Sequence, residues 1–208
     1  MQPTQPIRLH DFPLSGHAHR VKLMLSLLGL PYEIIPVDLA AGEHKGPAFL
    51  AKNPFGQVPV IEDGDVTLAD SNAILVYLAG RYDPRWLPRE PLAAAQVQRW
   101  LSVAAGQLAF GPARARVIQL FGVPEDLTVA QKLASWLFSQ MEAHLARQDW
   151  MAADHPTIAD VALYSYTAHA PEGGVSLDDY PAISAWLGRV EALPGFIAMP
   201  RSPLPKAA

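Results

Sequence analysis

Three short stretches of the chain place chemically useful side chains at the expected start of a helix or a strand. Such positions can bind a ligand, because the first N–H groups of a helix are unpaired and lie at the positive end of its dipole. They are also ordinary turn and capping positions, so each stretch has two interpretations. The three stretches are Ser15-Gly16, Val58-Pro59 and Asp70-Ser71.

Ser15 precedes a strongly apolar helical pattern. As a helix N-cap it would accept a hydrogen bond from an unpaired backbone N–H, which contributes about 1 kcal/mol. As part of an anion site, its hydroxyl would donate to a ligand bound at the same helix start. The chain has no cysteine, so it supplies no disulfide, no thiolate metal site and no thiol for redox chemistry. Local sequence leaves both interpretations open.

Pro59 has no N–H group and cannot complete a normal ladder in a central strand. One interpretation is an edge strand that begins at this proline. The other is a cis peptide bond that turns the backbone of Val58 outward. Its N–H and C=O groups could then pair with an extended peptide, as in strand addition.

Asp70 and Ser71 stand just at the start of another helical pattern. A carboxylate in the first turn and a serine at a cap are common in helices. The pair also suits recognition, since a carboxylate holds an ammonium group, and a hydroxyl beside helix N–H groups holds a carboxylate. Together they match the head group of an α-amino acid, and both interpretations stay open.

Two further patterns favour plain structural roles. His10, His17 and His19 cluster in the sequence, but the spacing of the last two does not place them on one helix face, and we expect no metal site. Thr157 and Asp160 have capping-box spacing, with Asp in place of the usual Glu. They are expected to begin a buried helix.

Composition limits the class of protein. The chain has 208 residues, of which 50% are hydrophobic, so it can build a substantial core. A net charge of −4, with only 17% charged residues, argues against a nucleic-acid or anionic-membrane surface. No apolar run approaches the roughly 20 residues of a membrane span, and the first residues lack the plan of a signal peptide. We expect a cytoplasmic protein without nucleic-acid or membrane partners.

The first part of the chain alternates between strand and helix patterns in the order β-α-β-α-β-β-α. The first two strands should be parallel, because a helix joins them. The last two should form an antiparallel hairpin around Asp63-Gly64. Strands are expected at 7–11, 31–39, 58–63 and 66–69, and helices at 17–28, 45–53 and 71–82.

The second part of the chain is expected to be all-helical. Residues 83–91 hold three prolines and are typical of a linker. After them the strand signals disappear, which predicts a small α/β domain followed by a helical one. Helical patterns cover 92–121, 127–148, 155–168 and 180–193.

Four segments together carry a family resemblance: PLSGHAHRVKLMLSLLGLPYE, VDLAAGEHKGPAFLAKNPFGQVPVIEDGD, LADSNAILVYLAGRYDP and HPTIADVALYSY. They resemble the cytosolic glutathione S-transferase family, and most of all its bacterial serine-type members. The resemblance implies a thioredoxin-like domain with a mixed sheet over 7–82, a linker over 83–91 and an all-α bundle over 92–200. It also implies a cytoplasmic homodimer that acts in detoxification.

The resemblance gives roles to the three opening stretches. Ser15 matches the catalytic hydroxyl of the family. Val58 and Pro59 match the cis-proline loop, whose backbone pairs with the cysteinyl unit of glutathione. Asp70 and Ser71 match the residues that hold the γ-glutamyl end.

Other positions follow from the same resemblance. His17 stands where related bacterial members often carry Asn. His44 and Gln57 fall where the family places side chains near the glycyl carboxylate and the peptide, and Lys45 is an alternative to either. The pocket for the second substrate is expected to be lined by Phe12, Leu14, Phe110 and Arg114.

The implied reaction conjugates the glutathione thiolate to a small hydrophobic electrophile. A hydrogen bond to a charged group contributes roughly 1.5–3 kcal/mol, and one pKa unit is about 1.4 kcal/mol. A bond donated by Ser15, helped by the helix start, would therefore lower a thiol pKa of about 8.5 by about 1–2 units. The alternatives are glutathione-dependent reduction of disulfides or peroxides, and a non-catalytic glutathione-binding or interaction protein.

Overall fold

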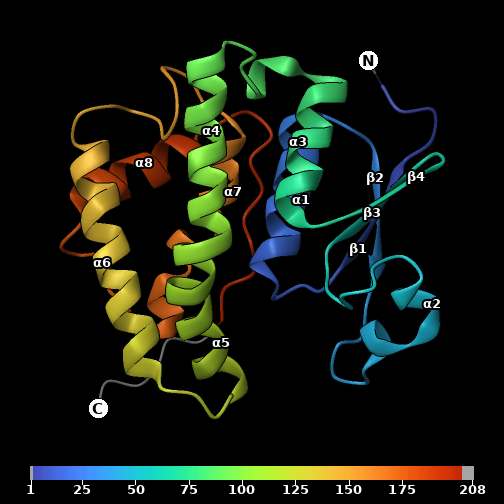
Figure 1. The fold of residues 1–208 in the computed structure, drawn as a ribbon, viewed down its shortest axis with the longest axis horizontal. Helices are drawn as coiled ribbons and strands as arrows, with labels where there is room; N and C mark the ends of the chain where they lie inside the picture. Colours follow the sequence, from blue (N-terminus) through green and yellow to red (C-terminus); the bar gives the residue numbers. More distant parts are fainter. Residues whose placement is uncertain (1, 203–208) are drawn as a thin grey trace. The chain divides into compact units, whose positions relative to one another are not determined.

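The computed structural model describes residues 2–202, which form two units. The first unit comprises residues 2–87 together with Leu193–Pro200, and the second comprises Pro88–Ala192 with residues 201–202. The first unit is the α/β domain predicted from the alternating patterns (Figure 1). Its elements are β1 (Ile7–Asp11), α1 (Gly16–Leu27), β2 (Tyr32–Pro36), η1 (Glu43–Lys45), α2 (Pro47–Leu50), β3 (Val60–Asp63), β4 (Val66–Ala69), α3 (Ser71–Tyr82) and η2 (Pro84–Trp86).

Four strands form one mixed sheet in the order β2-β1-β3-β4. The strand β1 runs parallel to β2, with Ile7 opposite Tyr32, and antiparallel to β3, with Leu9 opposite Ile61. The strands β3 and β4 form an antiparallel hairpin. The predicted parallel pair and the predicted hairpin are both confirmed, which gives the thioredoxin-like arrangement.

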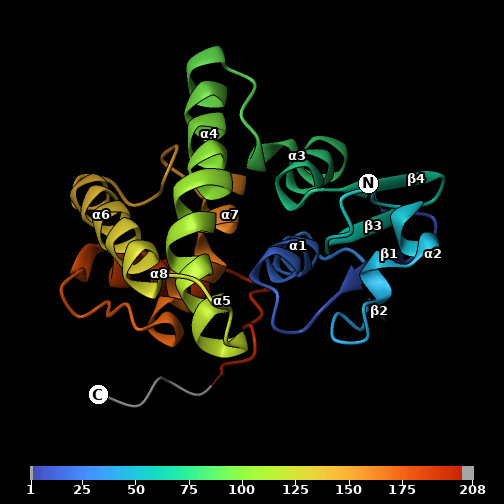
Figure 2. The same cartoon turned by 60° about the horizontal axis from the view of Figure 1, so that its bottom comes forward.

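Helices cover both faces of this sheet. Figure 2 shows α1 and α3 on one face and α2 on the other. The helix α1 fully buries Val21 and Leu25, and α3 fully buries Ile74 and Leu78. Burying such a side chain contributes about 1.5–3 kcal/mol, so this packing fixes the two helices side by side.

The segment Leu193–Pro200 belongs to the first unit, although the domain boundaries expected from sequence assigned it to the helical domain over 92–200. His19 Nε2 donates to the carbonyl oxygen of Ile197 at 3.0 Å, and Ser26 Oγ donates to that of Gly195 at 2.6 Å. A Cβ on Gly195 would lie 2.7 Å from the Ser26 carbonyl oxygen, so this close approach to α1 requires glycine.

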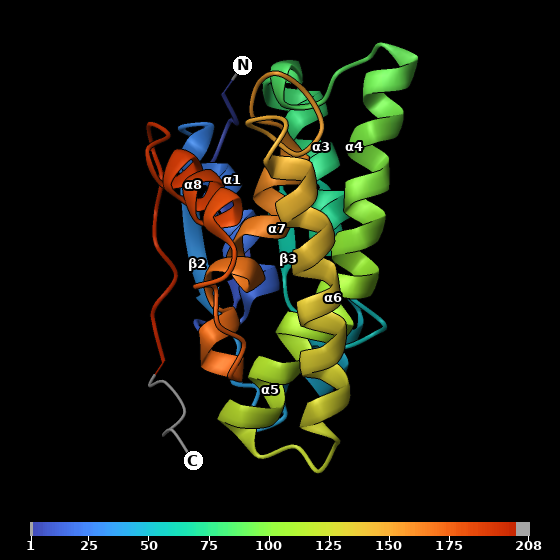
Figure 3. The same ribbon diagram turned by 90° about the vertical axis from the view of Figure 1, so that its left-hand side faces the viewer.

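The second unit is all-helical, as predicted. Figure 3, seen from the side of α6, shows α6 and α8 in front of α7. Every residue of α7 from Ile158 to Thr167 is buried, so this helix is the centre of the bundle. The elements are α4 (Pro91–Val103), η3 (Ala104–Ala113), α5 (Arg114–Phe121), α6 (Leu127–Leu145), α7 (Ile158–Ala168), η4 (Ala170–Gly173) and α8 (Pro181–Glu191).

The capping box predicted at the start of α7 is confirmed. The Asp160 carboxylate accepts a hydrogen bond from the Thr157 N–H at 2.9 Å. It also accepts bonds from the Met151 N–H and from Trp186 Nε1, each at 2.9 Å. Burial raises the pKa of this carboxyl group. Asp160 therefore has a structural role: its hydrogen bonds hold these three residues together at the centre of the bundle.

The long helical pattern over 92–121 divides into α4, the π-helical segment η3 and α5. Pro112 lacks the N–H that would bond the carbonyl of Leu108 in an α-helix. Gly111 lies against α6, where a Cβ would come within 2.9 Å of the Ala134 nitrogen. The spacing of apolar residues in the sequence does not reveal such a change from α-helix to π-helix. No helix within residues 2–202 is long and apolar enough to cross a membrane.

Candidate functional site

Ser15 is the N-cap of α1. Its backbone is extended, and its Oγ accepts a hydrogen bond from the Ala18 N–H at 3.2 Å. The capping interpretation is therefore confirmed. A hydroxyl has one proton and two lone pairs, so accepting from Ala18 leaves the Ser15 proton for another acceptor. Capping and anion binding are compatible in this geometry.

His17 is the second residue of α1 and is half-buried. Burial, and then the positive charge of Arg20, lower the pKa of His17 to about 3. The imidazole is therefore neutral at physiological pH. Beside Ser15 it can serve as a neutral hydrogen-bonding group.

The loop before β3 contains the Val58-Pro59 peptide bond in the cis form, as the second interpretation of this stretch expected. Asn53 organises the loop from inside: its Nδ2 donates to the carbonyl of Gln57 at 2.7 Å, and its Oδ1 accepts from the Phe55 N–H at 3.1 Å. Sequence reasoning gave Asn53 no role. The signal was its place before Pro54 in the stretch NPFGQVP at residues 53–59.

The turn η1 packs against this loop. Lys45 Nζ donates to the Gly56 carbonyl at 3.2 Å, and a Cβ on Gly56 would lie 2.7 Å from the His44 carbonyl oxygen. The structure thus brings His44 and Lys45 to the loop that carries Gln57. The Nδ1 atom of His44 is buried and has no hydrogen-bond partner within the described residues. Such an atom is rare in folded proteins, and a bound ligand is one of the partners that would satisfy it.

Asp70 and Ser71 begin α3. Asp70 is the N-cap, and its Oδ1 accepts from the Ala73 N–H at 2.9 Å. Its backbone has φ 70° and ψ 120°, a conformation that costs about 1–3 kcal/mol for a residue with a side chain and is concentrated at functional sites. Ser71 is buried, and its Oγ accepts from Arg20 Nη1 at 3.2 Å. Asp70 rather than Ser71 is the cap.

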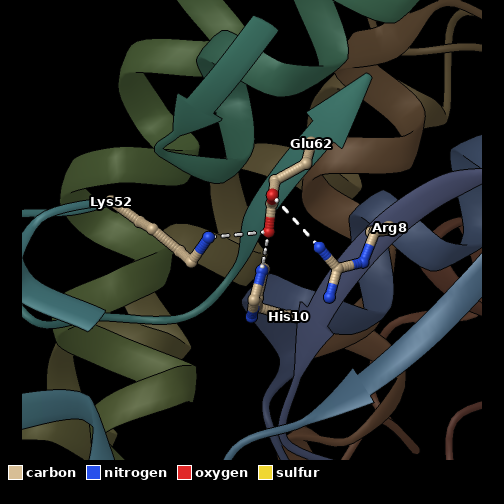
Figure 4. A network of polar contacts seen from close by, with 4 residues as sticks. All are labelled: Arg8, His10, Lys52 and Glu62. Atoms are coloured by element: carbon tan, nitrogen blue, oxygen red, sulfur yellow. Dashed lines mark hydrogen bonds and ion pairs between the residues drawn. The ribbon is translucent and has the colours of Figure 1, made fainter. Parts of the chain in front are cut away.

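The three clustered histidines separate in the structure. His10 Nε2 contacts Glu62 Oε1 at 2.5 Å, in a network that also joins Arg8 and Lys52 to Glu62 (Figure 4). These contacts lower the pKa of Glu62 to about 2. The hydrogen bond with His10 is the largest cause, followed by the hydrogen bond and charge of Lys52 and then the charge of Arg8. The buried His10 is therefore part of a partly buried ion-pair network, whereas His19 donates to the Ile197 carbonyl instead.

The residues expected to line a second-substrate pocket come from both units. Phe12 and Leu14 are half-buried in the loop between β1 and α1. Phe110 lies in η3 with its side chain exposed. Arg114, the first residue of α5, forms a two-pronged ion pair with Glu125 of the same unit.

Comparison with known proteins identifies the family. The model described as "Glutathione S-transferase, N-terminal domain" matches residues 5–80, and "Glutathione S-transferase, C-terminal domain" matches residues 119–194. "Glutathione S-transferase 3" of Zea mays is 35% identical over 221 residues, which cover 98% of this chain and 99% of that protein. The chain belongs to the glutathione S-transferase family.

Solved structures of glutathione S-transferases share the fold. The crystal structure of a glutathione S-transferase from Pseudomonas fluorescens is 40% identical, with a TM-score of 0.89, and covers 94% of this chain and 99% of that one. A glutathione transferase homolog from Drosophila mojavensis, solved with bound glutathione, is 31% identical, with a TM-score of 0.82. The match covers 91% of this chain and 89% of the homolog. These likenesses extend over both units of the chain.

Proposed function

We propose that this protein is a glutathione transferase that conjugates the glutathione thiolate to small hydrophobic alkyl or aryl electrophiles. The observation that carries the proposal is the Ser15 hydroxyl, which caps α1 through its lone pair and keeps its proton for an anion. The chain has no cysteine, so the nucleophilic sulfur must come from the substrate. Ser15 is the proposed catalytic residue.

Glutathione is proposed to lie along the first unit. The backbone of Val58, next to Pro59, pairs with the cysteinyl unit. Asp70 holds the γ-glutamyl ammonium group, and Ser71 holds its carboxylate. Support comes from the strained backbone of Asp70, which places a carboxylate beside the start of a helix.

The glycyl end is proposed to contact His44 and Gln57. The buried Nδ1 of His44, which has no partner in the described part of the chain, supports this assignment, because a peptide or carboxylate group would satisfy it. Lys45 is already bonded to the Gly56 carbonyl and is better placed to hold the loop than the ligand. His17, neutral and adjacent to Ser15, is proposed to contact glutathione near its cysteinyl unit.

The chemical step needs only an ionised thiol. A hydrogen bond donated by Ser15 to the sulfur, in the positive field of the α1 N-terminus, lowers the thiol pKa by about 1–2 units. Thiolate is then the major form near pH 7. Ser15 remains protonated and does not act as a base. The electrophile is proposed to bind over the sulfur, where Phe12 and Leu14 of the first unit are the proposed contacts.

The wider setting follows the family resemblance. We propose a bacterial, cytoplasmic homodimer that detoxifies electrophiles, without a metal cofactor. Light scattering in solution checks the dimer through the molar mass.

A substrate panel tests the proposed reaction. Purified protein is assayed for glutathione binding and then for turnover of an aryl halide, a hydroperoxide and a mixed disulfide. We expect binding and aryl-halide conjugation. Turnover of the hydroperoxide or disulfide alone would favour a reductase, and absence of glutathione binding would favour an interaction protein.

The variant Ser15→Ala tests the mechanism. We expect the pKa of bound glutathione, followed by thiolate absorbance, to rise by about 1–2 units, with kcat falling in parallel at pH 6.5. Ser139→Ala on the exposed face of α6 is the matched control. An unchanged thiol pKa in Ser15→Ala would rule out this role for Ser15.

A further inference from the structure

Arg20 joins the two helices that carry the proposed glutathione site. It lies on α1, and only 1% of its surface is exposed. Its Nη1 donates to Ser71 Oγ at 3.2 Å and to Asn72 Oδ1 at 2.9 Å. These acceptors are the first two residues of α3, so one buried cation connects α1 to the start of α3.

We propose that Arg20 is a positioning residue, which fixes the Ser71 hydroxyl as a hydrogen-bond donor toward the carboxylate of the γ-glutamyl unit. This inference rests on the proposed function, because it concerns the same ligand. Arg20, a residue of α1, would thus determine how selectively Ser71 of α3 recognises the γ-glutamyl carboxylate.

The Arg20 and Ser71 side chains differ in what they can donate and accept. A guanidinium group has five N–H donors, has no lone pair to offer and stays charged at any physiological pH. It therefore cannot take the proton of Ser71, and its contact occupies a lone pair of the hydroxyl oxygen. The Ser71 proton is directed to another acceptor, and a carboxylate meets that requirement.

Asn72 keeps the guanidinium in place. Its Oδ1 accepts the shorter of the two hydrogen bonds from Nη1, and it is attached to the same rigid helix turn as Ser71. Arg20 is thus held in a fixed position relative to the α3 backbone. A fixed donor loses less side-chain entropy when the ligand binds.

The charge of Arg20 also reaches the start of α1. After burial, it is the second cause of the lowered pKa of His17. One buried cation therefore adds to the positive ends of two helix dipoles. The combined field favours an anionic ligand at both helix starts.

Calorimetric titration of the intact protein with two ligands tests the inference. One ligand is glutathione, and the other is 4-aminobutyryl-cysteinyl-glycine, which lacks only the γ-glutamyl α-carboxylate. Arg20→Lys keeps the charge but loses the planar fork. We expect it to weaken glutathione about tenfold and the analogue less than about twofold.

A matched control and a second variant make the result specific. Arg81→Lys makes the same change at a half-exposed arginine of α3 and should leave both affinities unchanged. Asn72→Asp places a carboxylate against Arg20 and draws the guanidinium from Ser71. It should also weaken glutathione selectively, which keeps the inference testable if Arg20→Lys does not fold.

The possible outcomes separate this inference from the proposed function. Equal weakening of both ligands would indicate a general structural role for Arg20 and would overturn the inference. So would unchanged glutathione affinity, or a wild-type protein that binds the two ligands equally. A wild-type protein that binds neither ligand would instead overturn the proposed function.

Discussion

The helix starts of α1 and α3 each present a serine, but they hold it in different ways. Ser15 is half-buried, lies in extended backbone and accepts from an N–H three residues away in the chain. Ser71 is buried, follows a strained residue and accepts from Arg20, which is 51 residues away. In both cases an N–H group occupies a lone pair of the hydroxyl oxygen, and the proton is left for a ligand.

This difference separates two kinds of preorganisation. The orientation of Ser15 requires only that α1 forms, because its donor belongs to the same helix turn. The orientation of Ser71 requires that α1 and α3 pack correctly, because its donor belongs to another helix. The first is a local property of the chain, and the second is a tertiary one.

The largest expected effect comes from Ser71→Ala. Removing a hydrogen bond to a charged carboxylate should raise the KM for glutathione about 10–100-fold. The kcat and the pKa of the glutathione thiol should stay unchanged, because Ser15 is still present. Steady-state kinetics with varied glutathione measure this split, with Ser139→Ala as the control. A lower kcat with a raised thiol pKa would show that the two serines do not have separate tasks.

A smaller effect distinguishes capping from chemistry at Ser15. Alanine at an N-cap costs about 1 kcal/mol of unfolding free energy, whereas glycine costs a few tenths. Ser15→Gly should therefore be more stable than Ser15→Ala in urea unfolding, although both lack the hydroxyl and share the raised thiol pKa. A low thiol pKa retained in Ser15→Gly would mean that the helix N–H groups are sufficient.

The smallest effect concerns His17. With its pKa lowered to about 3, His17 should contribute no ionisation to the profile of kcat/KM between pH 5 and 8. His17→Asn should leave the shape of that profile unchanged. A step near pH 6.5 that disappears in His17→Asn would contradict the lowered pKa.

The lowered pKa of His17 also makes the unfolding free energy depend on pH. Because the folded pKa lies below the unfolded value of about 6.5, the unfolded chain binds more protons between these two values. His17 therefore reduces the unfolding free energy as the pH falls from about 6.5 toward 3. Measured by urea unfolding, the unfolding free energy of His17→Asn should therefore decrease less than that of the wild type over this pH range.

Much of the fold was predictable because its signals are local. The patterns at 7–11, 66–69 and 71–82 gave the bounds of β1, β4 and α3, and Thr157 with Asp160 marked the start of α7. Each depends on side-chain periodicity or on a contact across three residues. The region from 45 to 53 was harder, because it folds into a 3₁₀ turn and the four-residue α2.

The features that sequence missed depend on distant partners. The segment Leu193–Pro200 returns to α1 through Gly195, and the π-helical η3 places Gly111 against the backbone of α6. Asn53 organises its loop only once that loop is closed. Helical periodicity contains no information about such contacts.

The sequence by itself determined the order of strands and helices, the two-domain plan and the candidate stretches around Ser15, Val58-Pro59 and Asp70-Ser71. Only the tertiary structure decided that Arg20 orients Ser71, that Asp70 is the strained cap and that a His44 nitrogen has no partner within residues 2–202. The physical reason is the range of the interactions. Caps and turns are set by neighbours within a few residues, whereas the direction of a buried hydroxyl proton is set by whichever donor packing brings beside it.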